Sequence, residues 1–142
     1  MKGKILVTIQ FVSLALLLMF TNWILLPLWT YIPVLFSALL AFWAAGAMKP
    51  GNFNIVPYPV KNGVMISRGP YRLIRHPMYA SILIFSFGLL AGQFDYKKLL
   101  VSVVLMVCLV IKMYFEEKLL CAHHPGYKAY IQKTKRIIPF IW

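Results

Sequence analysis

The stretch ILVTIQFVSLALLLMFTNWILLPLWTYIPVLFSALLAFWAAGAM, residues 5–48, carries no charged side chain. As a single helix it would run about 66 Å, roughly twice the hydrocarbon core of a bilayer, which is about 30 Å thick. The stretch must therefore turn back on itself, and Pro27 and Pro33 mark the natural place for that reversal. We predict two membrane-spanning helices here, at about residues 5–26 and 33–48.

The rest of the chain continues this apolar pattern. Of its 142 residues, 61% are hydrophobic, a proportion well above that of soluble domains. Two more apolar runs, residues 77–94 and 99 to about 120, predict a second helical hairpin. We therefore expect an all-α fold, a polytopic integral-membrane protein with about four transmembrane helices in a single membrane domain. Residues 1–48 form the first hairpin, and residues 49–142 supply an ordered cytoplasmic loop, the second hairpin and a C-terminal cytoplasmic tail.

Basic residues set the expected orientation of these spans. The net charge is +12, and four spans would place almost all of it on one side, with only Lys97 and Lys98 on the other. The positive-inside rule then predicts a multi-pass protein with both termini cytoplasmic, which we assign to the inner (plasma) membrane. Membrane lipids are the expected partners of this charge, whereas nucleic acid is not, because no reading motif accompanies it. A secretory signal is the alternative interpretation of the N-terminus, but no small-residue cleavage site follows Phe20.

The sequence GPYRLIRHPMY, residues 69–79, opens the third apolar run. It begins with a turn dipeptide, continues through residues that suit a short helix, and breaks again at His76-Pro77. The free N–H groups at the start of the following helix, next to Arg75 and His76, suit an anionic ligand group such as a carboxylate. The simpler interpretation is a basic headgroup anchor followed by a helix start.

A pair of adjacent carboxylates, Glu116 and Glu117, lies near the end of the last apolar run in a chain with only three acidic residues. Two such groups at a membrane interface repel each other and lose solvation, so they require cationic partners or a cationic ligand. Lys112, one turn earlier, can pair with Glu116 on the same helix face, although snorkelling to the interface is an alternative. Arg72, Arg75 and His76 are the other candidates, which predicts one polar site at one membrane face.

These motifs together resemble a known family, the isoprenylcysteine carboxyl methyltransferase and phospholipid methyltransferase superfamily of integral-membrane enzymes. The segments similar to its signature are Gly69-Pro70-Tyr71-Arg72, Arg75-His76-Pro77-Met78-Tyr79, Glu116-Glu117, and in the tail Tyr127, Tyr130, Thr134-Lys135-Arg136 and Ile138-Pro139. The resemblance covers about residues 57–142, whereas the first hairpin matches only in being apolar.

The resemblance implies a methyltransferase that uses S-adenosylmethionine and acts on a lipophilic small-molecule or lipid-anchored acceptor, in the manner of isoprenylcysteine carboxyl O-methyltransferase. The cofactor would bind at the cytoplasmic face, beneath a lid built from the loop before the third span and the tail. Carried over residue by residue, its contacts would be Tyr71, His76, Pro77, Met78, Tyr79, Glu116, Glu117 and the stretch Gly63, Val64, Met65 and Ile66. Glu116 would hold the charged methionine portion, and Lys112 would occupy the position of a basic residue that approaches the methyl acceptor. The candidate catalytic residues are Lys112, Glu116 and Arg75.

Two departures from the family pattern leave alternatives open. Lys112 replaces the usual arginine and lacks its planar fork, and His124-Pro125-Gly126 replaces the usual Phe-Gly pair of the tail. An NADPH-dependent membrane reductase of the sterol type and a non-enzymatic membrane partner protein are the other functions that we consider. No metal site is expected, because the spacing of Cys121, His123 and His124 matches no closed zinc pattern. The oligomeric state and the identity of the acceptor stay open.

Overall fold

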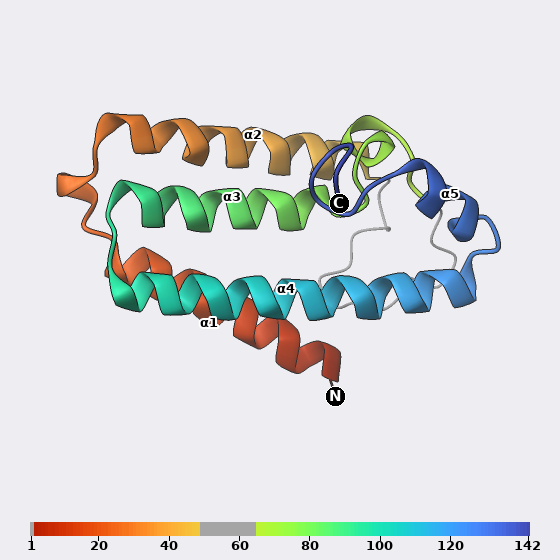
Figure 1. The fold of residues 1–142 in the computed structure, drawn as a ribbon, viewed down its shortest axis with the longest axis horizontal. Helices are drawn as coiled ribbons and strands as arrows, with labels where there is room; N and C mark the ends of the chain where they lie inside the picture. The colour runs from red at the N-terminus through yellow and green to blue at the C-terminus, as the bar shows by residue number, and fades with distance from the viewer. Residues whose placement is uncertain (1, 49–64) are drawn as a thin grey trace.

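The computed structural model describes residues 2–48 and 65–142, and these residues form helices joined by turns (Figure 1). The α-helices are α1 (Lys2–Phe20), α2 (Tyr31–Ala47), α3 (Pro77–Gly92), α4 (Tyr96–His123) and α5 (Tyr127–Lys133). Three short 3₁₀ helices are η1 (Trp23–Leu25), η2 (Leu28–Thr30) and η3 (Gly69–Arg72). The prediction of an all-α fold is confirmed for this part of the chain.

Within residues 2–48 and 65–142, three segments are long and apolar enough to cross a membrane, namely Gly3–Phe20 in α1, Leu28–Ala47 through η2 and α2, and Tyr96–His123 in α4. The fourth apolar helix, α3, has 16 residues and is shorter than a usual span of about 20 residues. The protein therefore has the character of a membrane protein, while the number of four spans stays a prediction.

The helix boundaries correct two of the predicted spans. The first span was expected to run to Leu26, but α1 ends at Phe20 because the Asn22 side chain accepts from the backbone N–H of Ile24 and starts η1. The last span begins earlier than residue 99, because the Asp95 carboxylate caps the N–H of Lys97 at 2.6 Å. Polar side chains thus mark the end of α1 and the start of α4.

The helices pack as two pairs, α1 against α4 and α2 against α3 (Figure 1). Leu17 of α1 is fully buried against Leu105 and Leu109 of α4. Between α2 and α3 the backbones approach closely, since a Cβ added at Gly88 would lie 2.9 Å from the ring of Pro33. Glycine at a helix interface permits this approach within a membrane. The packing brings the start of α3 and the last turns of α4 to the same end of the bundle.

The loop predicted over residues 49–75 is described only from Met65 onward. Its first part, with Gly63 and Val64, lies outside the described residues. Gly69 adopts a positive φ of 58°, and a Cβ there would lie 2.9 Å from Cβ of Ala47. This glycine therefore lets η3 lie directly against the end of α2.

Candidate functional site

The turn that precedes α3 is fixed by the C-terminal tail. The backbone N–H groups of Arg75 and His76 donate to the carbonyls of Lys135 and Arg136 at 2.7 and 3.0 Å, and Lys135 N–H donates to Leu73 O at 3.1 Å. A parallel bridge joins Ile74 to Lys135 at the same place. Helix α3 begins at Pro77, as predicted. The hydrogen bonds to the tail therefore fix the position of Arg75 and His76, the two residues that precede the helix.

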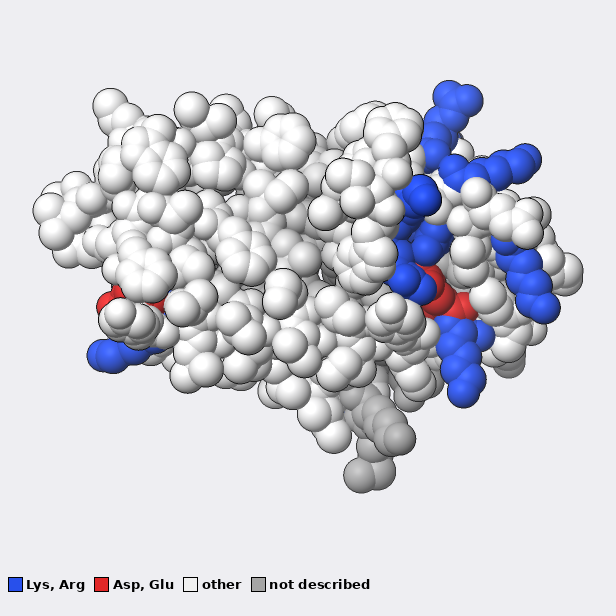
Figure 2. Space-filling view, viewed as in Figure 1, with Lys and Arg blue, Asp and Glu red and all other residues white. Residues whose placement is uncertain are grey.

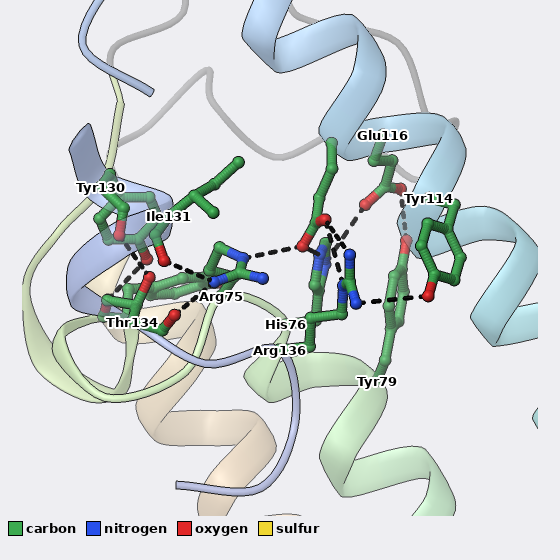
Figure 3. A network of polar contacts seen from close by, with 11 residues as sticks. Arg75, His76, Tyr79, Tyr114, Glu116, Tyr130, Ile131, Thr134 and Arg136 are labelled. Carbon is green, nitrogen blue, oxygen red and sulfur yellow. Dashed lines mark hydrogen bonds and ion pairs between the residues drawn. The ribbon is translucent and has the colours of Figure 1, made fainter. Parts of the chain in front are cut away.

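Glu117 of α4 lies at the centre of a cluster of cationic side chains, of which Arg75, His76 and Arg136 are labelled in Figure 3. Arg75 Nε donates to Oε1 of Glu117 at 2.8 Å, and Arg136 Nε donates to Oε2 at 3.2 Å. His76 Nε2 lies 3.3 Å from Oε1. Arg75 also donates to the backbone carbonyls of Ile131 and Thr134. The Glu117 side chain is 8% exposed, so its charge is matched and largely removed from water.

Glu116 has a different environment from its neighbour. Its carboxylate accepts from the Tyr79 hydroxyl and lies 3.7 Å from His76 Nδ1. Among the described residues it forms no ion pair with a lysine or arginine. The ring of Tyr79 stacks on His76, with centroids 5.4 Å apart and an interplanar angle of 5°. Glu116 keeps 20% of its side chain exposed, so of the two carboxylates it is the one less matched by cationic side chains among the described residues.

Lys112 does not make the predicted pair with Glu116. Its ammonium donates to Oε1 of Gln10 at 3.0 Å and lies 5.0 Å from the centroid of the Tyr79 ring. Lys112 is 2% exposed, so it does not snorkel to the interface either. The helical spacing predicted a local pair, but a partner from α1, distant in the sequence, competes for the ammonium inside the bundle.

Most of the charge on the face shown in Figure 2 lies at one end of the bundle, where Lys and Arg side chains surround acidic atoms, and a smaller group of acidic and basic atoms lies at the opposite end. We call the first of these ends, formed by the start of α3, the last turns of α4 and the tail, the basic end. The far end carries Asp95, Lys97 and Lys98. The predicted meeting of residues 75–76 with residues 116–117 is observed at the basic end.

Three of the remaining predicted contacts, Tyr71, Ile66 and Met78, share one apolar cluster at the end of α2. Tyr71 of η3 is buried there with Ala44 and Ala47, and Ile66 and Met78 pack against it. The Tyr130 hydroxyl donates to the backbone carbonyl of Tyr71 at 2.6 Å. The remaining two are Pro77, which is buried at the start of α3, and Met65, whose Cε lies 4.0 Å from where a Cβ of Gly126 would be.

Two contributions escaped the sequence reasoning. Gln10 was not recognised as a partner of Lys112, although it is one of only two amide side chains in the uncharged stretch of residues 5–48. Arg136 was noted only as part of the tail, whereas it contacts Glu117 directly. An amide within a predicted span is the signal that could have identified Gln10, because a polar group in a membrane needs a partner.

The fold and site first define a class, an all-helical membrane protein with a paired-carboxylate site where a helix start meets a helix end. Comparison with known families then gives the family. The family model described as phospholipid methyltransferase matches residues 28–125, well over half of the chain. The chain belongs to the phospholipid methyltransferase family, which makes it a membrane methyltransferase and confirms the resemblance found in the sequence. No curated protein matches the chain.

Proposed function

We propose that the protein transfers a methyl group from S-adenosylmethionine to a lipophilic acceptor at the basic end of the bundle. Family membership supports the reaction class. The observation that supports the cofactor assignment is the contrast between the two carboxylates: Glu117 is paired with two arginines, whereas Glu116 is paired with none in the described part of the chain.

The residues present suit this cofactor, which carries a sulfonium, an ammonium and a carboxylate. A partly buried carboxylate without a strong cationic partner stabilises a cationic ligand group. We therefore assign the ammonium of the methionine portion to Glu116. Glu117 was predicted as a second cofactor contact, but its partners favour a positioning role that holds the Arg75 turn and the tail against α4.

The chain contributes position and a dry environment to the reaction. When bound, S-adenosylmethionine supplies an electrophilic methyl group on a sulfonium whose charge disappears during transfer, so alignment in an apolar site supplies much of the rate. Tyr79 is oriented by its stacking on His76 and by its hydrogen bond to Glu116. The buried Lys112 lies over the same ring, so Tyr79 separates the proposed cofactor contact from the proposed acceptor contact.

Lys112 favours an anionic acceptor. A buried ammonium attracts a carboxylate and repels a protonated amine. A carboxylate also needs no general base before it accepts a methyl group. We therefore propose carboxyl O-methylation, as in isoprenylcysteine carboxyl methyltransferases, with the acceptor entering from the bilayer.

Cofactor binding is tested by thermal unfolding of the detergent-solubilised protein with S-adenosylhomocysteine. We expect the melting temperature to rise with this ligand but not with NADPH, and the rise to be lost in Glu116→Gln. Asp95→Asn is the matched control, because it also removes an acidic charge, but one that lies at the far end of the bundle. Stabilisation that survives Glu116→Gln, or that appears with NADPH alone, would refute the assignment.

Acceptor class is tested by methyl transfer in nanodiscs. Transfer from labelled S-adenosylmethionine to an N-acetylated S-prenyl cysteine is expected, and transfer to phosphatidylethanolamine is not. Lys112→Gln should reduce the rate without changing the thermal shift given by S-adenosylhomocysteine. Transfer to the amine alone would show that the acceptor assignment is wrong while leaving the cofactor assignment in place.

We also propose that α3 completes a bundle of four spans with both termini in the cytoplasm, in the inner (plasma) membrane. The basic end would then face the cytoplasm, in agreement with the positive-inside rule. In intact cells, a membrane-impermeant thiol reagent should label Lys97→Cys, at the far end. It should label Lys128→Cys only after permeabilisation, and the reverse pattern would invert the proposed topology.

A further inference from the structure

Residues 137–142 form a closed loop at the end of the tail, which we call the tail loop. The N–H groups of Ile137 and Ile138 donate to Trp142 O at 3.0 and 2.8 Å, and those of Ile141 and Trp142 donate to Ile138 O at 3.3 and 3.2 Å. Much of the polar backbone of the loop is thus satisfied within the loop itself. This is the condition that a segment must meet to enter an apolar environment.

The tail loop presents its apolar side chains outward. Phe140 is 85% exposed and Ile141 is 75% exposed. Phe140 also adopts a φ of 66°, a left-handed conformation that glycine or asparagine tolerates better than phenylalanine. Because the ring is so exposed, contacts within the chain do little to offset this strain. The exposed ring is therefore available for a contact beyond the described residues.

Arg136 ties the tail loop to the site. Its guanidinium carbon lies 5.6 Å from the centroid of the Trp142 ring and 4.4 Å from that of Tyr114. The same guanidinium donates to Glu117 at 3.2 Å. Figure 3 shows Arg136 next to Tyr114 of α4, and Figure 1 shows the tail running from α5 back toward the bundle. A displacement of the tail loop would therefore move a cationic partner of Glu117.

The depth of the tail loop follows from Arg136, the residue that precedes it, whose guanidinium lies near the rings of both Trp142 and Tyr114. Tyr114 lies about 13 Å along the axis from the end of α4 at His123. The helix has 28 residues, so its length of about 42 Å exceeds a hydrocarbon core by about 12 Å. Since the basic residues gather at this end (Figure 2), the excess length projects here. The loop then lies where the acyl chains meet the headgroups.

We propose that the tail loop is a membrane anchor, in which Phe140 and Ile141 insert into the leaflet at the basic end and hold Arg136 against Glu117. Exposed Lys133 and Lys135 precede it, a combination of apolar and basic side chains that suits anionic headgroups above an acyl boundary. Lipid is favoured over a protein partner because Arg136 links the loop to Tyr114, a half-exposed residue of a helix that is long and apolar enough to span a membrane. The anchor requires only a bilayer, so it goes beyond the proposed reaction.

The depth of the tail loop in the bilayer is tested with nitroxide labels on the full chain, in vesicles of phosphatidylcholine and phosphatidylglycerol. The labels are attached in a Cys108→Ala, Cys121→Ser background. Labels at Phe140→Cys and Ile141→Cys should collide more with oxygen than with a water-soluble nickel chelate. A label at Gln132→Cys, which is exposed on α5, should show the opposite preference. Aqueous accessibility at 140 and 141 equal to that at 132 would overturn the anchor, and so would protection from both reagents, which would indicate a protein partner.

A matched pair of variants tests whether the apolar side chain of Phe140 holds the tail in place. Phe140→Asn suits the left-handed backbone but removes the apolar group, whereas Phe140→Leu keeps the apolar group and the strain. In the same vesicles, trypsin should cleave after Lys133 and Lys135 about tenfold faster in Phe140→Asn, from the lost burial of one large side chain. Phe140→Leu should be cleaved at nearly the unsubstituted rate. Equal rates for both variants, or faster cleavage of Phe140→Leu, would overturn the proposal whether or not the protein binds S-adenosylhomocysteine.

Discussion

Replacement of Glu117 by glutamine tests whether this carboxylate holds the site together. The buried group accepts from Arg75 at 2.8 Å and from Arg136 at 3.2 Å. Removing one partner of a buried ion pair typically costs about 3–5 kcal/mol. The glutamine oxygen can still accept one bond, and Arg75 keeps its two backbone carbonyls, so we expect a loss of about 3 kcal/mol. In a chain of this size that loss lowers the melting temperature by about 6–12 °C.

The measurement is thermal unfolding of the purified protein in detergent, followed by tryptophan fluorescence with and without S-adenosylhomocysteine. The matched variant is Glu116→Gln, which removes the adjacent charge but breaks no arginine pair. Its melting temperature should fall by no more than about 3 °C, which corresponds to about 1 kcal/mol, while its response to the ligand disappears. A Glu117→Gln protein as stable as the unsubstituted one, or less affected than Glu116→Gln, would refute the assignment of the two roles.

Three further substitutions test the packing around the site and the far end. Gln10→Leu leaves the buried ammonium of Lys112 without this acceptor; a double-mutant cycle with Lys112→Met, read by thermal unfolding, should give a coupling of about 1.5–3 kcal/mol, and zero coupling would contradict the contact. Gly92→Ala places a Cβ against the side chain of Thr30 and should destabilise the fold by about 1–3 kcal/mol. Gly46→Ala, where nothing lies within 4 Å of the added Cβ, should not destabilise it. Equal melting temperatures for the two variants would contradict this packing. Burial raises the pKa of Tyr130 to about 12, so the folded state keeps its proton while the unfolded state loses it above about pH 10. Stability should therefore decline as the pH rises from about 10 to about 12, and Tyr130→Phe should show a shallower decline in unfolding experiments across that range.

The sequence predicted the fold well because its strongest signals are local. An uncharged stretch longer than a bilayer is thick must reverse, and His76-Pro77 starts α3 as expected. Local rules were less successful where several segments compete for one group. The spacing of Lys112 and Glu116 suits a pair on one helix, yet the ammonium turns to Gln10. Spacing along one helix cannot reveal a hydrogen-bond partner on another helix, so the packing of α1 against α4 determines which group the ammonium binds.

The site shows the same division between local and distant signals. The adjacent glutamates and the Arg75-His76 turn were identified together because their unusual charge demanded partners. The different roles of Glu116 and Glu117 were not apparent, since adjacent positions on a helix differ only by a rotation of about 100°. That difference depends on Arg136, which a tail distant in the sequence brings to one carboxylate and not to the other.

The contacts of Gln10 and Arg136 have a consequence for engineering. Both residues lie outside the part of the chain that matches the family, residues 28–125, yet each binds a charged group within it. In a chimaera that kept this shared core, the exchanged flanks would decide whether Lys112 and Glu117 keep these contacts. Exchange of the amino-terminal flank alone would alter the surroundings of Lys112 while sparing Glu117, so it would test the proposed acceptor role of Lys112 separately from the pairing of Glu117.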